Sequence, residues 1–335
     1  MKQLVVISGK GGTGKTSITA SFAALADEAV LADCDVDAPD LPIVLEPRVL
    51  ERHDVYSGVE AAIRADRCTG CGLCVEHCRF GAVVTTGADA LGAGVACREC
   101  DVCVRSCALR NTAEMRAMAA AAGYELPGGY VIDPVTCEGC GVCAHVCPAG
   151  AIELTDRLCG QWMVSQTRVG PMVHARLEIA AENSGKLVTA VRTEARRLAE
   201  SQGARLVIVD GSPGIGCPVI ASITGADLVL IVTEPTLSGK HDLARVAELT
   251  RYFEVPAMVC VNKWDLSTEV AGWIESLATE LGIPSAGRVR YDNAVVAAQL
   301  RRLSVVEAGA SAVADDIRSV WRSVQEALGP QAERG

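Results

Sequence analysis

Runs of aliphatic and β-branched residues recur toward both ends of the chain, and polar or glycine residues follow each run. They lie in the segments LVVIS (4–8), AVLADCDVDAPDL (29–41), ARLVIVDGSPGIG (204–216), ADLVLIVTEP (226–235) and VPAMVCVNKWD (255–265), with helix-compatible stretches between them. Short apolar runs of this kind are typical of strands that are buried on both faces. Strands that alternate with helices predict an α/β fold with a doubly wound, mainly parallel sheet, which binds its ligand at the carboxyl ends of the strands.

A glycine-rich loop follows the first run. It reads Gly9-Lys10-Gly11-Gly12-Thr13-Gly14-Lys15-Thr16, and the helix-compatible segment SITASFAALAD comes directly after it. Strand, loop and helix occur in the order of a P-loop, whose glycines let backbone N–H groups face the phosphates of a nucleotide. In this motif Lys15 would reach the β and γ oxygens, and the Thr16 hydroxyl would hold Mg²⁺. We therefore expect a nucleoside triphosphate and Mg²⁺ at residues 9–16, with an incidental glycine-rich turn as the alternative.

The first lysine of this loop, Lys10, is not required by an ordinary P-loop. It makes KGGTGKT resemble the deviant Walker A motif of the MinD/ParA family of P-loop ATPases, in the SIMIBI class. The resemblance implies an ATP-dependent homodimer in which Lys10 contacts the nucleotide held by the partner subunit. A solvated surface lysine is the alternative interpretation of Lys10.

Two further strand ends carry acidic residues that match this family. In the resemblance, Asp35 corresponds to the aspartate that positions the attacking water, with Asp33 and Asp37 as neighbours. Asp210 ends a Walker B strand, precedes a switch II turn and would hold Mg²⁺ through water. A carboxylate at a strand end beside the phosphates can orient water or Mg²⁺ without reacting itself. The expected catalytic residues are therefore Lys10, Lys15, Asp35 and Asp210.

The last apolar run ends in Asn262-Lys263-Trp264-Asp265, which is the N-K-x-D motif of GTPases. In that interpretation Asp265 would accept hydrogen bonds from guanine. In MinD-like proteins the asparagine at this strand end contacts adenine instead. We prefer ATP because Lys10 is the more family-specific feature, and GTP stays open.

Twelve of the sixteen cysteines form three groups with the spacing C-x2-C-x2-C-x3-C. The groups are Cys68, Cys71, Cys74 and Cys78; Cys97, Cys100, Cys103 and Cys107; and Cys137, Cys140, Cys143 and Cys147. This spacing is typical of [4Fe–4S] ligands, and the fourth cysteine commonly ligates the other cluster of a two-cluster ferredoxin. A zinc ribbon would need two C-x-x-C pairs that are farther apart.

The first and third groups match beyond their cysteines, as CTGCGLCVEHCRFGAV and CEGCGVCAHVCPAGAI. We therefore predict crossed ligation of two [4Fe–4S] clusters. Cys68, Cys71, Cys74 and Cys147 would hold one cluster, and Cys137, Cys140, Cys143 and Cys78 the other. The middle group lacks the flanking repeat and is followed by an alanine-rich helical segment; it suits a third cluster, pairing with a neighbouring group, or another metal. His77 and His145 are interpreted as hydrogen-bonding residues rather than ligands.

These groups interrupt the nucleotide-binding pattern. We expect a small α+β, ferredoxin-like domain inserted at residues 64–158, within a P-loop ATPase domain formed by residues 1–63 and 159–335. The chain resembles MinD-like ATPases that carry an inserted ferredoxin domain over nearly its whole length. Segments that carry the resemblance include NSGKLVTAVR (183–192), residues 210–243 and VRYDNAVV (289–296). The middle cysteine group departs from that pattern.

Charge and apolar content limit which partners and which cellular location we expect. The net charge of −10 and the sequence pI of about 5.1 disfavour nucleic acid and anionic membranes as partners. The N-terminus lacks the pattern of a signal peptide, and no apolar run reaches the roughly 20 residues needed to span a bilayer. We expect a cytoplasmic protein. The segment DDIRSVWRSVQEALG has apolar residues at helical spacing and mixed charges, which favours packing on the sheet over membrane binding.

Four cysteines remain outside the groups. Cys34 and Cys260 are expected in the core, Cys217 follows the switch II turn and is interpreted as structural, and Cys159 is unassigned. In the nitrogenase iron protein, a relative of the MinD/ParA family, a cysteine in the region of Cys217 binds a cluster that bridges the dimer.

The pattern as a whole predicts an ATP-hydrolysing iron–sulfur protein. Its nucleotide-driven dimer cycle would be coupled to [4Fe–4S] clusters, for low-potential electron transfer or for metallocluster assembly with an unidentified protein partner. One alternative is a positioning ATPase of the MinD/ParA type whose clusters are structural or redox-sensing. The other is a GTPase that uses the N-K-x-D motif.

Overall fold

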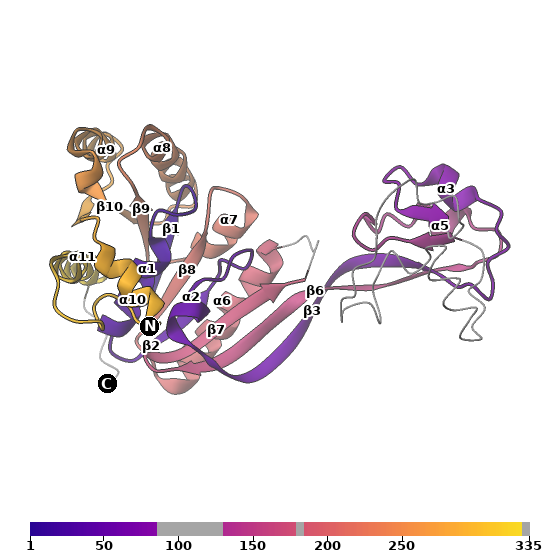
Figure 1. The fold of residues 1–335 in the computed structure, drawn as a ribbon, viewed down its shortest axis with the longest axis horizontal. Coiled ribbons are helices and arrows are strands. Elements are labelled where there is room, and N and C mark those ends of the chain that lie inside the picture. Colours follow the sequence, from indigo (N-terminus) through magenta and orange to yellow (C-terminus); the bar gives the residue numbers. More distant parts are fainter. Residues whose placement is uncertain (86–129, 179–183, 330–335) are drawn as a thin grey trace. The chain divides into compact units, whose positions relative to one another are not determined.

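The computed structural model describes residues 1–85, 130–178 and 184–329. It divides into two compact units, Met1–Val55 with Cys159–Gly335, and Tyr56–Leu158. Figure 1 shows the elements of both units. The middle cysteine group, at residues 97–107, lies outside the described residues.

The first unit is built on a sheet with the strand order β11-β10-β9-β1-β8-β2-β7-β6-β3. The strands are β1 (Lys2–Ser8), β2 (Ala29–Asp33), β3 (Arg48–Ile63), β6 (Ile152–Thr167), β7 (Gly170–Leu177), β8 (Leu206–Pro213), β9 (Leu228–Thr233), β10 (Ala257–Asn262) and β11 (Ser285–Val289). The pairs from β11 to β7 are parallel, and β6 pairs antiparallel with β7. The predicted α/β fold with a mainly parallel sheet is confirmed.

Helices cover both faces of this sheet, because alternate residues of its strands point to opposite sides. In β1, Leu4 and Val6 face one core with α1, α2, α10 and α11, while Val5 and Ile7 face the other with α6, α7, α8 and α9. The helices are α1 (Lys15–Leu25), α2 (Leu41–Leu45), α6 (Ser184–Gln202), α7 (Cys217–Ile223), α8 (Leu237–Tyr252), α9 (Thr268–Glu280), α10 (Asn293–Leu300) and α11 (Ala312–Leu328).

Helix α11 is the C-terminal segment for which we predicted packing on the sheet. Its residues Ile317, Val320, Val324 and Leu328 are buried, and the ring of Trp321 lies 4.8 Å from that of Phe22 in α1. The prediction is confirmed. Among the described helices, none combines the length and apolar character needed to cross a membrane.

The second unit repeats one structural pattern twice. Helix α3 (Leu73–His77) follows the first two cysteines of the first group, as α5 (Val142–Val146) follows the first two cysteines of the third group, and strand β4 (Val83–Thr85) comes after the first group. Strand β5 (Tyr130–Ile132) pairs antiparallel with β4. Arg64 N–H donates to Ala151 O at 2.7 Å, and Asp133 N–H donates to Ala82 O at 2.8 Å, so equivalent positions of the two sequence repeats bond reciprocally.

Strands β3 and β6 belong to both units. Each is 16 residues long, and the unit boundaries, at Val55–Tyr56 and Leu158–Cys159, fall inside them. The start of the second unit therefore precedes the expected position at residue 64, because β3 continues unbroken into that unit. No apolar run marks β3, whose exposed charged residues suit the outer strand of a sheet.

Candidate functional site

The glycine-rich loop joins β1 to α1, as the P-loop pattern predicts. Gly14 caps α1 with a backbone φ of 88°, a left-handed conformation that glycine adopts without strain. A β-carbon at Gly14 would also clash with the side-chain amide of Asn262 at the end of β10. The sharp start of α1 therefore depends on glycine at this position.

Lys15 lies at the centre of a buried polar cluster. Its ammonium group is 2.9 Å from Asp210 Oδ1 at the end of β8 and 3.4 Å from Asp35 Oδ2 after β2. Two hydroxyl groups of α1 donate to the same aspartate, Thr16 to Oδ2 at 2.7 Å and Thr19 to Oδ1 at 2.9 Å. The structure thus brings together Lys15, Thr16, Asp35 and Asp210, as predicted from separate segments of the sequence.

Burial and charge together perturb the ionisation of this cluster. Burial alone would lower the pKa of Lys15, but Asp210 and Asp35 raise it above the ordinary value. Burial raises the pKa of Asp35, and Lys15 counteracts part of that rise. Burial and the neighbouring Asp210 raise the pKa of Asp33 well above the usual carboxyl range. Asp33 Oδ1 accepts a hydrogen bond from Asp35 N–H at 3.0 Å, which connects the two aspartates on either side of Cys34.

Lys10 contacts residues of its own chain. Its ammonium group is 2.7 Å from Glu234 Oε1 after β9, 2.9 Å from Ser238 Oγ and 3.2 Å from Thr236 Oγ1. Lys263 binds the other oxygen of Glu234 at 3.0 Å and donates to Gly12 O at 2.8 Å. Glu234 therefore bridges Lys10 of the P-loop and Lys263 after β10, and this role had no signal in the sequence.

Asn262 and Asp265, the predicted base-contacting residues, both make internal hydrogen bonds. Asn262 Nδ2 donates to Thr13 O at 2.7 Å, and its Oδ1 accepts from Lys263 N–H at 3.0 Å. Asp265 Oδ1 accepts from Tyr291 N–H at 2.7 Å. Asn262 lines the nucleotide cavity, whereas Asp265 is not among its lining residues.

A cavity of about 900 Å³ opens over the P-loop. Its polar part is lined by residues 11–17, Asp35 and Asn262, and its apolar part by residues of α2 and α10. The volume lies within the range of small-molecule sites. Thr13 Oγ1 is buried and has no hydrogen-bond partner among the described residues, so it offers a donor to a phosphate oxygen. The residues present therefore fit a nucleotide with Mg²⁺.

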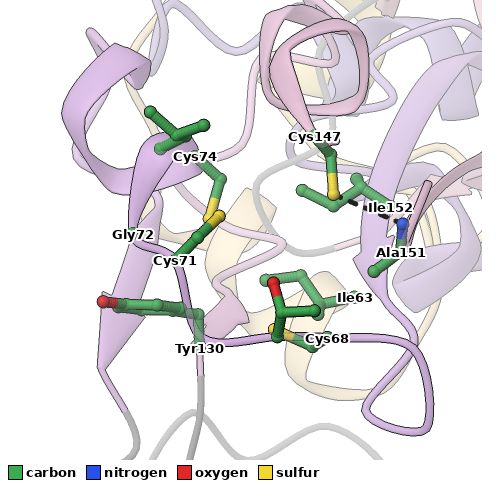
Figure 2. A pocket seen from close by; sticks show the side chains of 11 residues that line it. Ile63, Cys68, Cys71, Gly72, Cys74, Tyr130, Cys147, Ala151 and Ile152 are labelled. Atoms are coloured by element: carbon green, nitrogen blue, oxygen red, sulfur yellow. Dashed lines mark hydrogen bonds between the residues drawn. The ribbon is translucent and has the colours of Figure 1, made fainter. Parts of the chain in front are cut away.

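The second unit contains two cavities, each lined by four cysteines. Figure 2 shows the first, where Cys147 of the third group joins three cysteines of the first group, Cys68, Cys71 and Cys74. Ile63, Tyr130 and Ile152 also line it, and Ala151 N–H donates to Cys147 Sγ at 3.3 Å. The thiols that crossed ligation assigns to one cluster therefore surround one space.

The second cavity has the complementary set. Cys78 of the first group lies with Cys137, Cys140 and Cys143 of the third, among apolar residues that include Ala61 and Ile132. The second cysteine of each group, Cys71 or Cys140, is exposed, while Cys74, Cys137 and Cys143 are buried. Four thiols in a largely apolar cavity fit the donor set of a [4Fe–4S] cluster.

A single metal ion needs its ligands crowded closely around one point, with sulfur about 2.3 Å from zinc. In residues 1–85, 130–178 and 184–329, no group of three or more His, Cys, Asp or Glu side chains is arranged to hold a metal ion. A four-iron cluster is ligated by sulfurs spread around a cube, so its cysteines surround a space, as the four cysteines of each cavity do.

The remaining cysteines and histidines differ in environment. Cys34 and Cys260 are buried in the core, as predicted. Cys159 is also buried, whereas Cys217 is exposed at the start of α7. His77 Nδ1 lies 3.0 Å from Leu73 O, which agrees with a hydrogen-bonding role.

Comparisons with known proteins agree with this geometry. Residues 4–305 match the family described as the CobQ/CobB/MinD/ParA nucleotide binding domain. The uncharacterized protein MJ0578 of Methanocaldococcus jannaschii is 30% identical over 265 residues, which cover 78% of either chain. MinD with Mg-ADP from Pyrococcus horikoshii aligns over 99% of both chains, with a TM-score of 0.54 and 12% identity. A chain of the MinC:MinD cell division protein complex from Aquifex aeolicus aligns with this one over 100% of this chain and 99% of its own length. The TM-score is 0.52 and the identity is 16%. At these identities the two structures are similar in fold alone.

Proposed function

Because the chain belongs to the CobQ/CobB/MinD/ParA family of nucleotide-binding domains, we propose that it is an ATPase whose dimer cycle is coupled to two [4Fe–4S] clusters. The observation that carries the proposal is the exchange of Cys78 and Cys147 between the two cysteine cavities. Two separate zinc sites or a set of unrelated thiols would give no reason for each fourth cysteine to line the cavity of the other group. Ferredoxin-type clusters do give that reason.

In the nucleotide unit, the buried cluster around Lys15 provides the groups for phosphate hydrolysis. Lys15 would bind the β and γ oxygens of ATP, and Thr16 with Asp210 would hold Mg²⁺. Asp35 lies beside Lys15 and would orient a water molecule toward the γ-phosphorus. The new P–O bond forms as the bond to the β-phosphate oxygen breaks, so ATP and water give ADP and phosphate.

Adenine is favoured over guanine by the position of Asp265. Its carboxylate accepts the backbone N–H of Tyr291 and does not line the cavity. A guanine-reading carboxylate would have to face the base. Competition between ATP and GTP for the purified protein tests this preference.

In the second unit, each set of four cysteines would hold one cluster. A bound [4Fe–4S] cluster would supply one-electron redox chemistry, and the apolar walls and backbone hydrogen bonds around the cysteines would tune its potential. The partner would be a redox protein or a cluster-accepting protein. Lys10 would leave Glu234 to contact the nucleotide of a second subunit, so that dimer formation depends on ATP.

The test is iron and sulfide analysis of the anaerobically purified full chain, with EPR of the reduced protein recorded with and without MgATP. We expect about eight iron atoms for two clusters, and about four more if the middle group holds a third. MgATP should change the EPR spectrum of the wild type and leave that of Lys15→Ala unchanged. Protein without iron and sulfide would refute the clusters, and an unchanged wild-type spectrum would refute the coupling.

A further inference from the structure

An arginine side chain of the second unit holds the turn that leads into the third cysteine group. Arg157 in β6 donates from Nη1 to Cys137 O and from Nη2 to Pro134 O, both at 3.1 Å. The residue is half-buried and belongs to the same unit as the turn. A guanidinium group stays charged in proteins, and its planar shape fixes its position when it donates two hydrogen bonds. A permanent positive charge is therefore held against the peptide of Cys137.

The turn itself is stabilised by Asp133. Its Oδ1 accepts from Val135 N–H at 3.0 Å, and its Oδ2 accepts from the Thr136 hydroxyl at 2.9 Å. Its backbone oxygen accepts from Cys137 N–H at 3.0 Å. Cys137 is only 7% exposed and lines the second cavity. These bonds fix the cavity wall at Cys137, so the guanidinium group bonded to that wall keeps a constant separation from the cavity.

A charge of the opposite sign lies at the same cavity. Glu138, directly after Cys137, is one of the lining residues, and it is exposed to solvent. Water and salt screen the charge of an exposed side chain more strongly than that of a half-buried one. Arg157 and Glu138 therefore act on the cavity in opposite directions, and we expect the stronger effect from Arg157.

We propose that Arg157 raises the reduction potential of the cluster in the second cavity, the one whose ligands are Cys78, Cys137, Cys140 and Cys143. The inference rests on the proposed function, since it concerns one of the two proposed clusters. Reduction moves one electron from a one-electron donor, here a redox protein, onto the cluster and adds one negative charge to it. Net charge is among the properties that set the potential of an iron–sulfur cluster. The fixed cation of Arg157 stabilises the added negative charge, so the reduced form is favoured.

The test is a redox titration of the anaerobically purified full chain with dithionite, followed by EPR. The signal that changes in Cys140→Ser belongs to the cluster of the second cavity. Arg157→Gln keeps a hydrogen-bond donor and removes the charge. At the wild-type midpoint potential it should lower the ratio of reduced to oxidised cluster about tenfold, which is about 59 mV for a one-electron couple. Arg157→Lys keeps the charge and should stay within about threefold of the wild type.

Two further variants serve as matched controls. Glu138→Gln removes the opposite charge from the same cavity and should raise the ratio, by about two- to threefold because the carboxylate is exposed. Arg64 is almost half exposed and pairs with Glu153 at 3.1 Å and with Asp66 at 3.3 Å. Arg64→Gln should therefore change the ratio by less than about twofold. Shifts of opposite sign in Arg157→Gln and Glu138→Gln would identify charge as the cause, because a purely structural role predicts no such reversal.

The outcomes separate this inference from the proposed function. An iron-loaded Arg157→Gln with an unchanged potential, or equal shifts in Arg157→Gln and Arg157→Lys, overturns the inference and leaves the proposed function intact. If Arg157→Gln loses iron, Arg157→Lys decides. Iron and potential retained in Arg157→Lys support the role of the charge, whereas loss of iron there too shows that Arg157 only stabilises the turn. A wild type without iron and sulfide overturns the proposed clusters themselves.

Discussion

Lys10 and Glu234 form an ion pair of 2.7 Å, and the second oxygen of the same carboxylate binds Lys263 at 3.0 Å. The pair is only partly buried, since 31% of the Lys10 side chain is exposed. Glu234 therefore holds Lys10 within its own chain, through a partly exposed contact. A lysine that engages a partner subunit would have to break this contact first.

Replacing Glu234 with Gln should favour the ATP-dependent dimer. Gln keeps a hydrogen-bond acceptor for Lys10 but removes the negative charge. Moving the Lys10 ammonium group away from residue 234 to a partner subunit therefore costs less free energy. A partly exposed ion pair contributes about 0.2–1 kcal/mol, which corresponds to a dimer dissociation constant lowered by up to about fivefold. Analytical ultracentrifugation with MgATP measures this dissociation constant. The exposed Glu248→Gln in α8 is the control, and a weaker dimer in Glu234→Gln would contradict the idea that this contact competes with dimer formation.

Gly14→Ala should destabilise the nucleotide-free protein by about 2 kcal/mol or more, because it combines backbone strain with the loss of the hydrogen bond from Asn262 to Thr13. Gly11→Ala is the matched change in the same loop, since its β-carbon would meet no atom of the described residues within 4 Å. It should stay within about 0.5 kcal/mol of the wild type. Urea denaturation followed by circular dichroism compares the two, and equal free energies of unfolding would show that Gly14 is not required by its backbone.

Asp33→Asn should make the protein more stable at neutral pH. Because the pKa of Asp33 is raised in the folded state, the folded protein binds this proton more tightly than the unfolded chain does. Stability is then lost as pH rises above the ordinary carboxyl range of about 4. Asn keeps the acceptor for Asp35 N–H and has no proton to lose. Thermal melting between pH 5 and pH 8 should show a higher Tm and a flatter pH dependence for Asp33→Asn; a lower Tm throughout would contradict the prediction.

Asp265→Asn should leave the preference between ATP and GTP unchanged. Asn retains an oxygen for Tyr291 N–H, so the loop after β11 keeps its position. We expect dissociation constants for both nucleotides within about twofold of the wild type, since no base contact is lost. Fluorescent-nucleotide competition measures them, with Lys15→Ala as the variant that binds neither. A selective loss of GTP affinity of tenfold or more would instead assign Asp265 to guanine.

The P-loop, Asp35 and Asp210 were predictable because each belongs to a short motif at a strand end, and parallel strands bring such ends to one edge of the sheet. The cysteine groups were predictable from local spacing and from their repeat. Strand β3 was missed because Arg48, Glu51, Arg52 and Asp54 interrupt any apolar run. The contact of Glu234 with Lys10 depends on two loops that meet only in the folded sheet, and no local pattern encodes it.

The bond between Arg64 N–H and Ala151 O joins the two ends of the cysteine-containing segment at 2.7 Å. The segment between these residues therefore begins and ends at neighbouring positions, directly after β3 and directly before β6. A short turn in place of residues 65–150 would close β3 onto β6 without moving either strand. We therefore expect a variant with such a turn to keep the strand pairing of the nucleotide unit, because the pairing of Gly160–Thr167 with β7 lies outside the replaced segment.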